Sequence, residues 1–212
     1  MRLISLYYYI LQYSPVLPLG YALFHLRKLD KPLKLFIGYL TTSLFLTIVM
    51  TPLARSGQNN LWIMNISFLP YAAWILSMFA IWQKRPILAK AMKGAVFFFF
   101  AVWGLEIWLS GGLFQFTTYS RPLLGILFTA CSCITIFDGN SDPDVPLTDQ
   151  PRFWLSAGIL LYFGGMLVVN LASQSLLKSS QDSLYAVIMI QPALNLVSNL
   201  FYFAGLRAQC RR

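Results

Sequence analysis

The side chains best suited to hold a ligand form a polar stripe in the last apolar segment of the chain, which spans residues 184–206. The members of this stripe are Gln191, Asn195, Ser198 and Tyr202. Spacings of four, three and four residues place them on one face of a helix. Because an unpaired amide is costly in hydrocarbon, this face must point toward protein or water. The stripe therefore predicts a helix inside a bundle, with hydrogen-bonding groups that a ligand can use.

The composition is that of a membrane protein. Of the 212 residues, 58% are hydrophobic and only 11% are charged, whereas soluble domains carry roughly 25% charged residues. This length fits one bundle, so we predict a single transmembrane domain over residues 1–212. The net charge of +9 comes from short basic runs between apolar segments, and orientation in a membrane explains such runs better than nucleic-acid binding does.

Seven apolar segments with short connections predict an all-α, polytopic membrane bundle of seven transmembrane helices. The predicted helices span residues 4–26, 34–53, 61–82, 94–112, 122–137, 153–173 and 184–206. The division between residues 94 and 137 stays open. Gly111 and Gly112 predict a turn between two helices there, but one long helix followed by a re-entrant piece also fits.

The basic residues predict the orientation. If the seven helices alternate, twelve of the sixteen Lys and Arg residues fall on one side, leaving Arg2, Arg55, Arg121 and Lys178 on the other. The positive-inside rule then places the N-terminus outside and the C-terminus in the cytoplasm. We expect a multi-pass protein of the inner (plasma) membrane, in contact with the lipid bilayer. Its basic cytoplasmic face is suited to dock a partner protein or anionic lipid.

Glu106 is the ionisable residue that lies well inside an apolar segment. At about 1.5 Å per residue, Glu106 and Gln191 both lie roughly 10 Å from the outer surface. A carboxylate at that depth is expected to face inward, toward amide partners. We predict a small polar pocket in the outer half of the bundle, with Glu106 as counter-ion or proton acceptor. The predicted ligand-binding residues are Glu106, Gln191, Asn195, Gln12, Tyr13, Asn65 and Asn170. In the alternative interpretation, these amides only make hydrogen bonds between helices, or Glu106 reaches the headgroups.

Several specific chemistries do not fit the chain. A retinal protein needs a lysine midway along its last helix, and the segment over residues 184–206 has none. Intramembrane proteases need HExxH or a pair of membrane aspartates, and the chain has neither. A serine nucleophile with a histidine base is also unsupported, because the single histidine, His25, lies at the opposite face of the membrane from the polar cluster. Cys131 and Cys133 are two residues apart and do not share a helix face. We expect no metal, no cofactor and no catalysis, although a Glu-based or lipid-directed enzyme stays open.

Three stretches carry a resemblance to known proteins: PRFWLSAGILLYFGGMLV in the sixth segment, NNLWIM at the start of the third, and YYYI near the N-terminus. There the chain resembles a family of uncharacterised bacterial seven-helix membrane proteins that are often associated with sensor kinases. The resemblance implies seven helices and a role in signalling. The chain departs from the family in the third segment, where Asn65 and Pro70 stand in place of an expected His and Glu.

These observations favour a sensory or ligand-binding module that binds a small molecule and acts through a partner protein, because connections this short hold no effector domain. One alternative is a small-solute transporter, which needs polar groups that continue to the inner face; Ser198 and Tyr202 hint at such a path. The other alternative is a structural membrane scaffold without a ligand.

Overall fold

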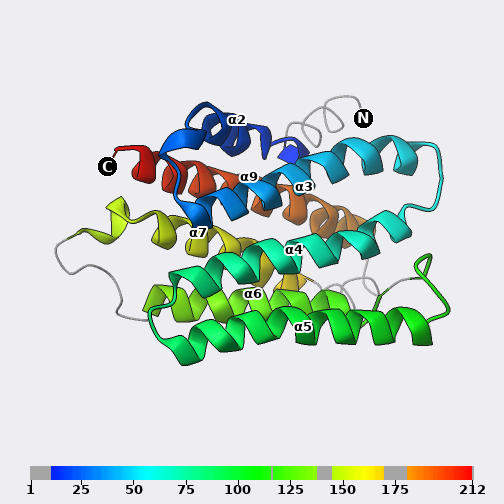
Figure 1. Cartoon of the computed structure of the whole chain (residues 1–212). Coiled ribbons are helices and arrows are strands. Elements are labelled where there is room, and N and C mark those ends of the chain that lie inside the picture. Colours follow the sequence, from blue (N-terminus) through cyan, green and yellow to red (C-terminus); the bar gives the residue numbers. More distant parts are fainter. Residues whose placement is uncertain (1–10, 116, 138–144, 170–180, 212) are drawn as a thin grey trace.

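The computed structural model describes residues 11–115, 117–137, 145–169 and 181–211, and of residues 181–189 the backbone alone. Over these ranges the chain consists of helices and the turns that join them, without any strand. The helices lie side by side along one common direction (Figure 1). The prediction of an all-α bundle is confirmed.

The helices follow one another with short connections. In chain order they are α2 (Val16–Phe24), α3 (Lys31–Arg55), α4 (Leu61–Trp82), α5 (Pro86–Leu109), α6 (Ser120–Phe137), α7 (Pro151–Ile159) and α9 (Gln181–Arg211). Helix α7 continues as a π-helical turn, η3 (Leu160–Gly164), and the span then extends to Val169. Two 3-10 turns, η1 (Leu26–Lys28) and η2 (Leu147–Asp149), precede α3 and α7.

Within the described ranges, five helices are long and apolar enough to cross a membrane: α3, α4, α5, α6 and the span Pro151–Val169. The outward face of α5 carries large exposed apolar side chains, among them Phe97, Trp108 and Leu109. Such a face is stable in contact with lipid and unfavourable in water. The chain is therefore a membrane protein whose apolar helices suit contact with the bilayer.

Local sequence explains where two helices begin earlier than predicted. Helix α3 starts at Lys31 rather than at residue 34, because the Asp30 carboxylate accepts a hydrogen bond from the N–H of Leu33 at 3.2 Å. Helix α5 starts at Pro86 rather than at residue 94. Proline suits the first turn of a helix, because the N–H group that it lacks would have no hydrogen-bond partner within the helix there. The predicted third helix, residues 61–82, is confirmed.

The predicted first helix, residues 4–26, is interrupted in its described part. Tyr13–Pro15 forms a turn before α2, so a continuous helix through these residues is wrong. Pro15 has no N–H to donate, and the N–H groups of Val16 and Leu17 reach back three residues rather than four. Residues 4–10, and residues 170–173 of the predicted sixth helix, lie outside the described residues.

The region between residues 94 and 137 forms two helices, α5 and α6, joined by a turn. Gly111 and Gly112 have φ angles of 83° and 127°, which favour glycine strongly. The prediction of a turn at these glycines is confirmed. The alternative, one long helix followed by a re-entrant piece, is therefore wrong.

The two ends of the bundle differ in charge. We name the basic end by the described Lys and Arg residues near it: Arg27, Lys28, Lys31, Lys34, Lys84, Arg85, Lys90, Lys93, Arg152, Arg207 and Arg211. The connections between α2 and α3 and between α4 and α5 lie there, with the end of α9. The opposite end, which we name the distal end, holds the connections between α3 and α4 and between α5 and α6.

Aromatic side chains close the centre of the bundle between α3, α4 and α9. The ring centroids of Phe36 and Tyr202 are 4.8 Å apart, and those of Tyr39 and Tyr71 are 5.2 Å apart. Phe36 and Tyr202 are almost completely buried. These four side chains form an aromatic layer that joins α3, α4 and α9 in the interior of the bundle.

Candidate ligand-binding cavity

A cavity of about 550 Å³ lies in the distal half of the bundle. Its walls come from the distal halves of α3, α4, α6 and α9, from the turn η3, and from Gln12 ahead of α2. Exposed residues, including Arg55 and Gln191, belong to the lining, so the cavity reaches the protein surface. Sites for small molecules have volumes of about 300–1,000 Å³, so this cavity is large enough for a ligand.

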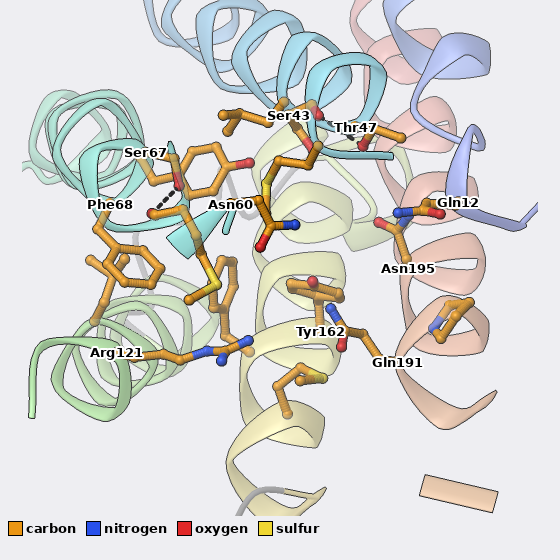
Figure 2. A pocket seen from close by; sticks show the side chains of 18 of the residues that line it. Gln12, Ser43, Thr47, Asn60, Ser67, Phe68, Arg121, Tyr162, Gln191 and Asn195 are labelled. Atoms are coloured by element: carbon orange, nitrogen blue, oxygen red, sulfur yellow. Dashed lines mark hydrogen bonds between the residues drawn. The ribbon is translucent and has the colours of Figure 1, made fainter. Parts of the chain in front are cut away.

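Polar side chains converge on the cavity from separate helices. Figure 2 shows Asn60, Arg121, Tyr162 and Gln191 pointing toward its middle from the N-cap of α4, from α6, from η3 and from α9. The hydroxyls of Thr47 and Thr51 on α3 donate within their own helix, to the carbonyls of Ser43 at 3.0 Å and Thr47 at 2.6 Å. A hydroxyl whose proton is used in this way still offers lone pairs to a ligand. The lining thus presents amide donors, guanidinium donors and hydroxyl acceptors.

Apolar side chains complete the walls. They are Leu46, Met50, Met64, Phe68, Leu124, Phe163, Met166 and Leu167. Thioether and aliphatic side chains of this kind adapt to apolar ligands of varied shape. The cavity is therefore amphipathic, and it suits a molecule with a polar group and an apolar body.

The π-helical turn η3 lies at this cavity. Two of its five residues, Tyr162 and Phe163, belong to the lining. A π-turn widens an α-helix locally and occurs often at functional sites, because the insertion is unfavourable unless something compensates for it. This irregularity is an observation, independent of the cavity itself, that points to a functional role here.

Three of the predicted ligand-binding residues, Gln12, Gln191 and Asn195, line the cavity. The Nδ2 of Asn195 also lies 3.4 Å from the carbonyl oxygen of Leu11 and 3.3 Å from the hydroxyl of Ser14, so Asn195 joins α9 to the start of the described chain. The side-chain oxygen of Gln12 is buried and has no hydrogen-bond partner among the described residues. An unpaired buried acceptor of this kind is available to a ligand that donates.

Glu106 lies outside the cavity, bound to the start of α6. Its carboxylate accepts hydrogen bonds from the N–H groups of Thr118 at 2.5 Å, Tyr119 at 2.8 Å and Ser120 at 2.7 Å. The hydroxyl of Ser120 is a fourth donor. The first N–H groups of a helix have no partner within the helix, and here a carboxylate from the neighbouring helix supplies one. Glu106 therefore holds α5 to α6, and we do not include it in the candidate site.

Asn65 also lies outside the cavity and supports the connection between α5 and α6. Its Nδ2 donates to the carbonyls of Leu113 at 2.7 Å and Gln115 at 2.8 Å, and its Oδ1 accepts from the hydroxyl of Thr117 at 3.1 Å. Tyr13 lies in the turn before α2 and is not part of the lining. Asn170 lies outside the described residues.

The site contains functional candidates that the sequence did not reveal, chiefly Arg55, Arg121 and Tyr162. Arg55 and Arg121 entered the prediction only as two of the four basic residues on the side with fewer positive charges. Their position on the side with fewer positive charges could have drawn attention to them, since the positive-inside rule leaves few basic residues there. Tyr162 gave no such signal, because a tyrosine in an apolar segment is usually part of the core.

Replacing Asn65 with leucine is expected to lower the free energy of unfolding by about 2–4 kcal/mol, because two carbonyls in part-buried hydrogen bonds and the buried hydroxyl of Thr117 lose their partners. Thermal unfolding in detergent micelles measures the change. The matched control is Asn59→Ala, since exposed Asn59 donates to the same connection, to the carbonyl of Phe114 at 3.2 Å. We expect a change below about 1 kcal/mol for this control. Equal effects in the two variants would contradict the structural role assigned to Asn65.

Among the described residues, no group of three or more His, Cys, Asp or Glu side chains is placed to hold a metal ion. Comparison with known proteins gives no assignment either: no protein-family model, no curated protein and no solved structure matches this chain.

Proposed function

We propose that this protein is a multi-pass module of the inner (plasma) membrane that binds a small amphipathic molecule in the distal cavity and passes the signal to a partner protein. The observation that supports it best is the convergence of polar side chains on a single cavity with apolar walls. A bundle that served only as a scaffold would gain stability by filling this space.

In this proposal the chain crosses the membrane seven times, with the basic end in the cytoplasm and the cavity open to the outside. Eleven of the thirteen described Lys and Arg residues lie at the basic end, as the positive-inside rule requires of a cytoplasmic face. A ligand from outside the cell would then reach the cavity without crossing the aromatic layer of Phe36 and Tyr202.

Helix α9 is the proposed route of the signal. It carries Gln191 and Asn195 at the cavity and ends at the basic end with Arg207 and Arg211. A ligand that binds better to one position of α9 shifts the population toward that position, and the basic end moves with it. A partner that docks on the basic face would detect this shift.

Transport of a small solute is the second candidate function, and one observation favours it. Buried hydroxyls without a hydrogen-bond partner among the described residues continue from the cavity toward the basic end, at Ser198, Ser156 and Ser132. However, large side chains that are completely buried, including Phe36 and Phe79, fill the core of the bundle. Because such a core leaves little room for a solute to pass, the binding function is better supported. Flux of the bound molecule in proteoliposomes would favour transport.

The binding function is tested by filling the cavity. Thr47→Phe places a large side chain in the lining, whereas Thr41→Phe makes the same change at an exposed position of α3. Native mass spectrometry of protein extracted from its own membrane is expected to show a bound small molecule in the wild type and in Thr41→Phe. We expect Thr47→Phe to lack it. If the wild type and Thr47→Phe carry the same bound mass, or neither carries any, the proposed function is wrong.

A further inference from the structure

A second hollow, which we name the basic groove, lies at the basic end of the bundle. The start of α7 and the end of α9 meet there (Figure 1). One wall comes from η2, the two residues just before it and Trp154, and the other is one face of α9 from Phe203 to Arg211. Its volume is about 640 Å³. This volume is within the range of about 300–1,000 Å³ that sites for small molecules have.

Two arginines of α9, Arg207 and Arg211, line the basic groove together, and both are exposed. Residues four apart on a helix share one face, with Cβ atoms roughly 5–6 Å from each other. From that separation two long side chains reach the oxygens of a single phosphate, which guanidinium groups bind through paired N–H donors. In the part of the chain that the structure describes, neither guanidinium makes a hydrogen bond or an ion pair. Their donors are therefore available to a ligand.

The charge of the basic groove is positive. Asp149 is the acidic residue of its described lining, so one carboxylate stands against two guanidinium groups. The surroundings add to the imbalance. Among the side chains described at the basic end, Asp30 and Asp149 are the acidic ones, against eleven Lys and Arg. The groove therefore attracts an anion.

Trp154 places the basic groove at the boundary between hydrocarbon and water. Its indole N–H donates to the carbonyl of Thr148 at 2.7 Å, which orients the ring, and tryptophan is enriched at that boundary in membrane proteins. A Cβ on Gly205 would lie 3.1 Å from the Cβ of Trp154, so the two residues are level. At about 1.5 Å per residue, Arg207 lies roughly 3 Å and Arg211 roughly 9 Å farther out along α9. Both arginines are thus at the level of lipid headgroups.

The inner part of the basic groove is apolar. Phe203 and Ala204 line it about one helical turn deeper than Arg207, and both are partly exposed. Ala208 lies between the two arginines, where its small side chain keeps the groove open. Apolar surface followed by positive charge is the order in which a phospholipid presents its acyl chains and its phosphate. A soluble anion would use the outer part alone.

From these observations we infer that the basic groove binds an anionic phospholipid of the surrounding leaflet, with its phosphate held by Arg207 and Arg211 and the start of an acyl chain against Phe203. Basic pockets between transmembrane helices are suited to lipid headgroups of this kind. The site lies at the opposite end of the bundle from the distal cavity and does not depend on the function proposed for that cavity.

Native mass spectrometry of the full chain in a neutral detergent tests the inference. The probe is palmitoyl-oleoyl phosphatidylglycerol, and its comparisons are phosphatidylethanolamine and phosphatidylcholine with the same acyl chains. We expect the phosphatidylglycerol to bind about fivefold or more tightly than either, since each basic residue near a membrane surface contributes roughly that factor toward an anionic lipid. Glycerol 3-phosphate, which has the phosphate without the chains, is expected to bind at least about tenfold more weakly.

Variants connect this binding to the basic groove. Arg207→Gln and Arg211→Gln are each expected to weaken phosphatidylglycerol binding about fivefold. Lys90→Gln is the matched control, because it removes one exposed charge at the same end from α5, which does not line the groove. We expect this control to bind as the wild type does. Ala208→Trp fills the groove but keeps both arginines, and it is expected to weaken binding as much as the loss of one arginine. Thr47→Phe, in the distal cavity, is expected to change nothing here.

Several results would overturn the inference. Equal binding of the three phospholipids, or of the phosphatidylglycerol to the wild type and both arginine variants, would show that these arginines select no lipid. If Ala208→Trp folds and binds as the wild type does, the attraction is spread over the basic end rather than located in the groove. If glycerol 3-phosphate binds as tightly as the lipid, the ligand is a soluble phosphate.

The chain itself contains the competing occupant. Residues 138–144, which precede the groove in the sequence and lie outside the described residues, include Asp138, Asp142 and Asp144. If the phosphatidylglycerol binds only after Asp142→Asn and Asp144→Asn are combined, this acidic segment fills the groove and the lipid site is wrong. If Ala208→Trp does not fold, the arginine variants decide the question, since both change exposed side chains. Each of these outcomes leaves the function proposed for the distal cavity unaffected.

Discussion

Replacing Glu106 with leucine is expected to lower the free energy of unfolding by about 3–5 kcal/mol, the largest effect that we predict for one side chain. The carboxylate accepts from three backbone N–H groups and the Ser120 hydroxyl, at a position almost closed to solvent. Leucine has a similar size but accepts nothing, so four donors would lose their partner together, two of them on buried Ser120. Equilibrium unfolding in bicelles, for example by steric trapping, measures this loss.

Two further variants calibrate the effect of Glu106. Asp30→Ala removes a carboxylate that caps α3 with one hydrogen bond, to the N–H of Leu33, and is expected to cost about 1 kcal/mol. Glu106→Gln keeps one acceptor oxygen, so its loss in the free energy of unfolding is expected to fall between those of Asp30→Ala and Glu106→Leu. Because Glu106 lies outside the cavity, a folded Glu106→Gln variant is expected to bind the ligand as the wild type does. A loss below about 1 kcal/mol for Glu106→Leu would contradict the role assigned to this carboxylate.

Replacing Gly205 with alanine is expected to lower the free energy of unfolding by about 1–3 kcal/mol, because α7 and α9 pack too closely for a Cβ atom. A Cβ at this position would overlap the Cδ1 of Leu155 and lie 3.1 Å from the carbonyl oxygen of Pro151. The side chain of Leu155 is completely buried and has little room to move away. The carbonyl of Pro151 belongs to the backbone of α7 and cannot move unless the helix itself shifts. The same unfolding measurement in bicelles reports the loss.

The matched control for Gly205 is Gly104→Ala on α5, where a Cβ atom would meet nothing within 4 Å. There the change is expected to be neutral or to stabilise the helix by up to about 1 kcal/mol, since alanine favours helix over glycine. A tolerated Gly205→Ala, with stability equal to that of the control, would show that α7 and α9 are not packed as described.

The fold was largely predictable because hydrophobic segments in a membrane protein have few alternatives to helices. The third helix and the turn at Gly111 and Gly112 were predicted correctly, since polar or glycine-rich stretches bound them clearly. The start of α5 was not, because Lys90 and Lys93 lie inside that helix and lower its apolar character. The turn at Tyr13–Pro15 was missed because a single proline only bends many membrane helices.

The site was predictable in part. Helical spacing alone placed Gln191 and Asn195 on one face, and the structure puts both in the cavity. Depth alone could not place Glu106 or Asn65, because their partners lie mostly on the backbone between α5 and the start of α6, 12–14 residues from Glu106 and 48–52 residues from Asn65. Hydrogen bonds to backbone leave no trace in residue types, so an inward-facing polar side chain can serve structure or ligand equally well.

The most direct test of the central claim, a polar cavity open on the side opposite the basic end, is the reactivity of single cysteines. Ser43→Cys places a thiol in the lining of the cavity. The control is Ser132→Cys, which places a thiol at a completely buried position. Both variants are made in a background without Cys131, Cys133 and Cys210. A membrane-impermeant thiosulfonate added outside intact cells is expected to modify Ser43→Cys rapidly and the control hardly at all. Protection of Ser43→Cys from outside, with modification only after the cytoplasmic side is opened, would contradict the account.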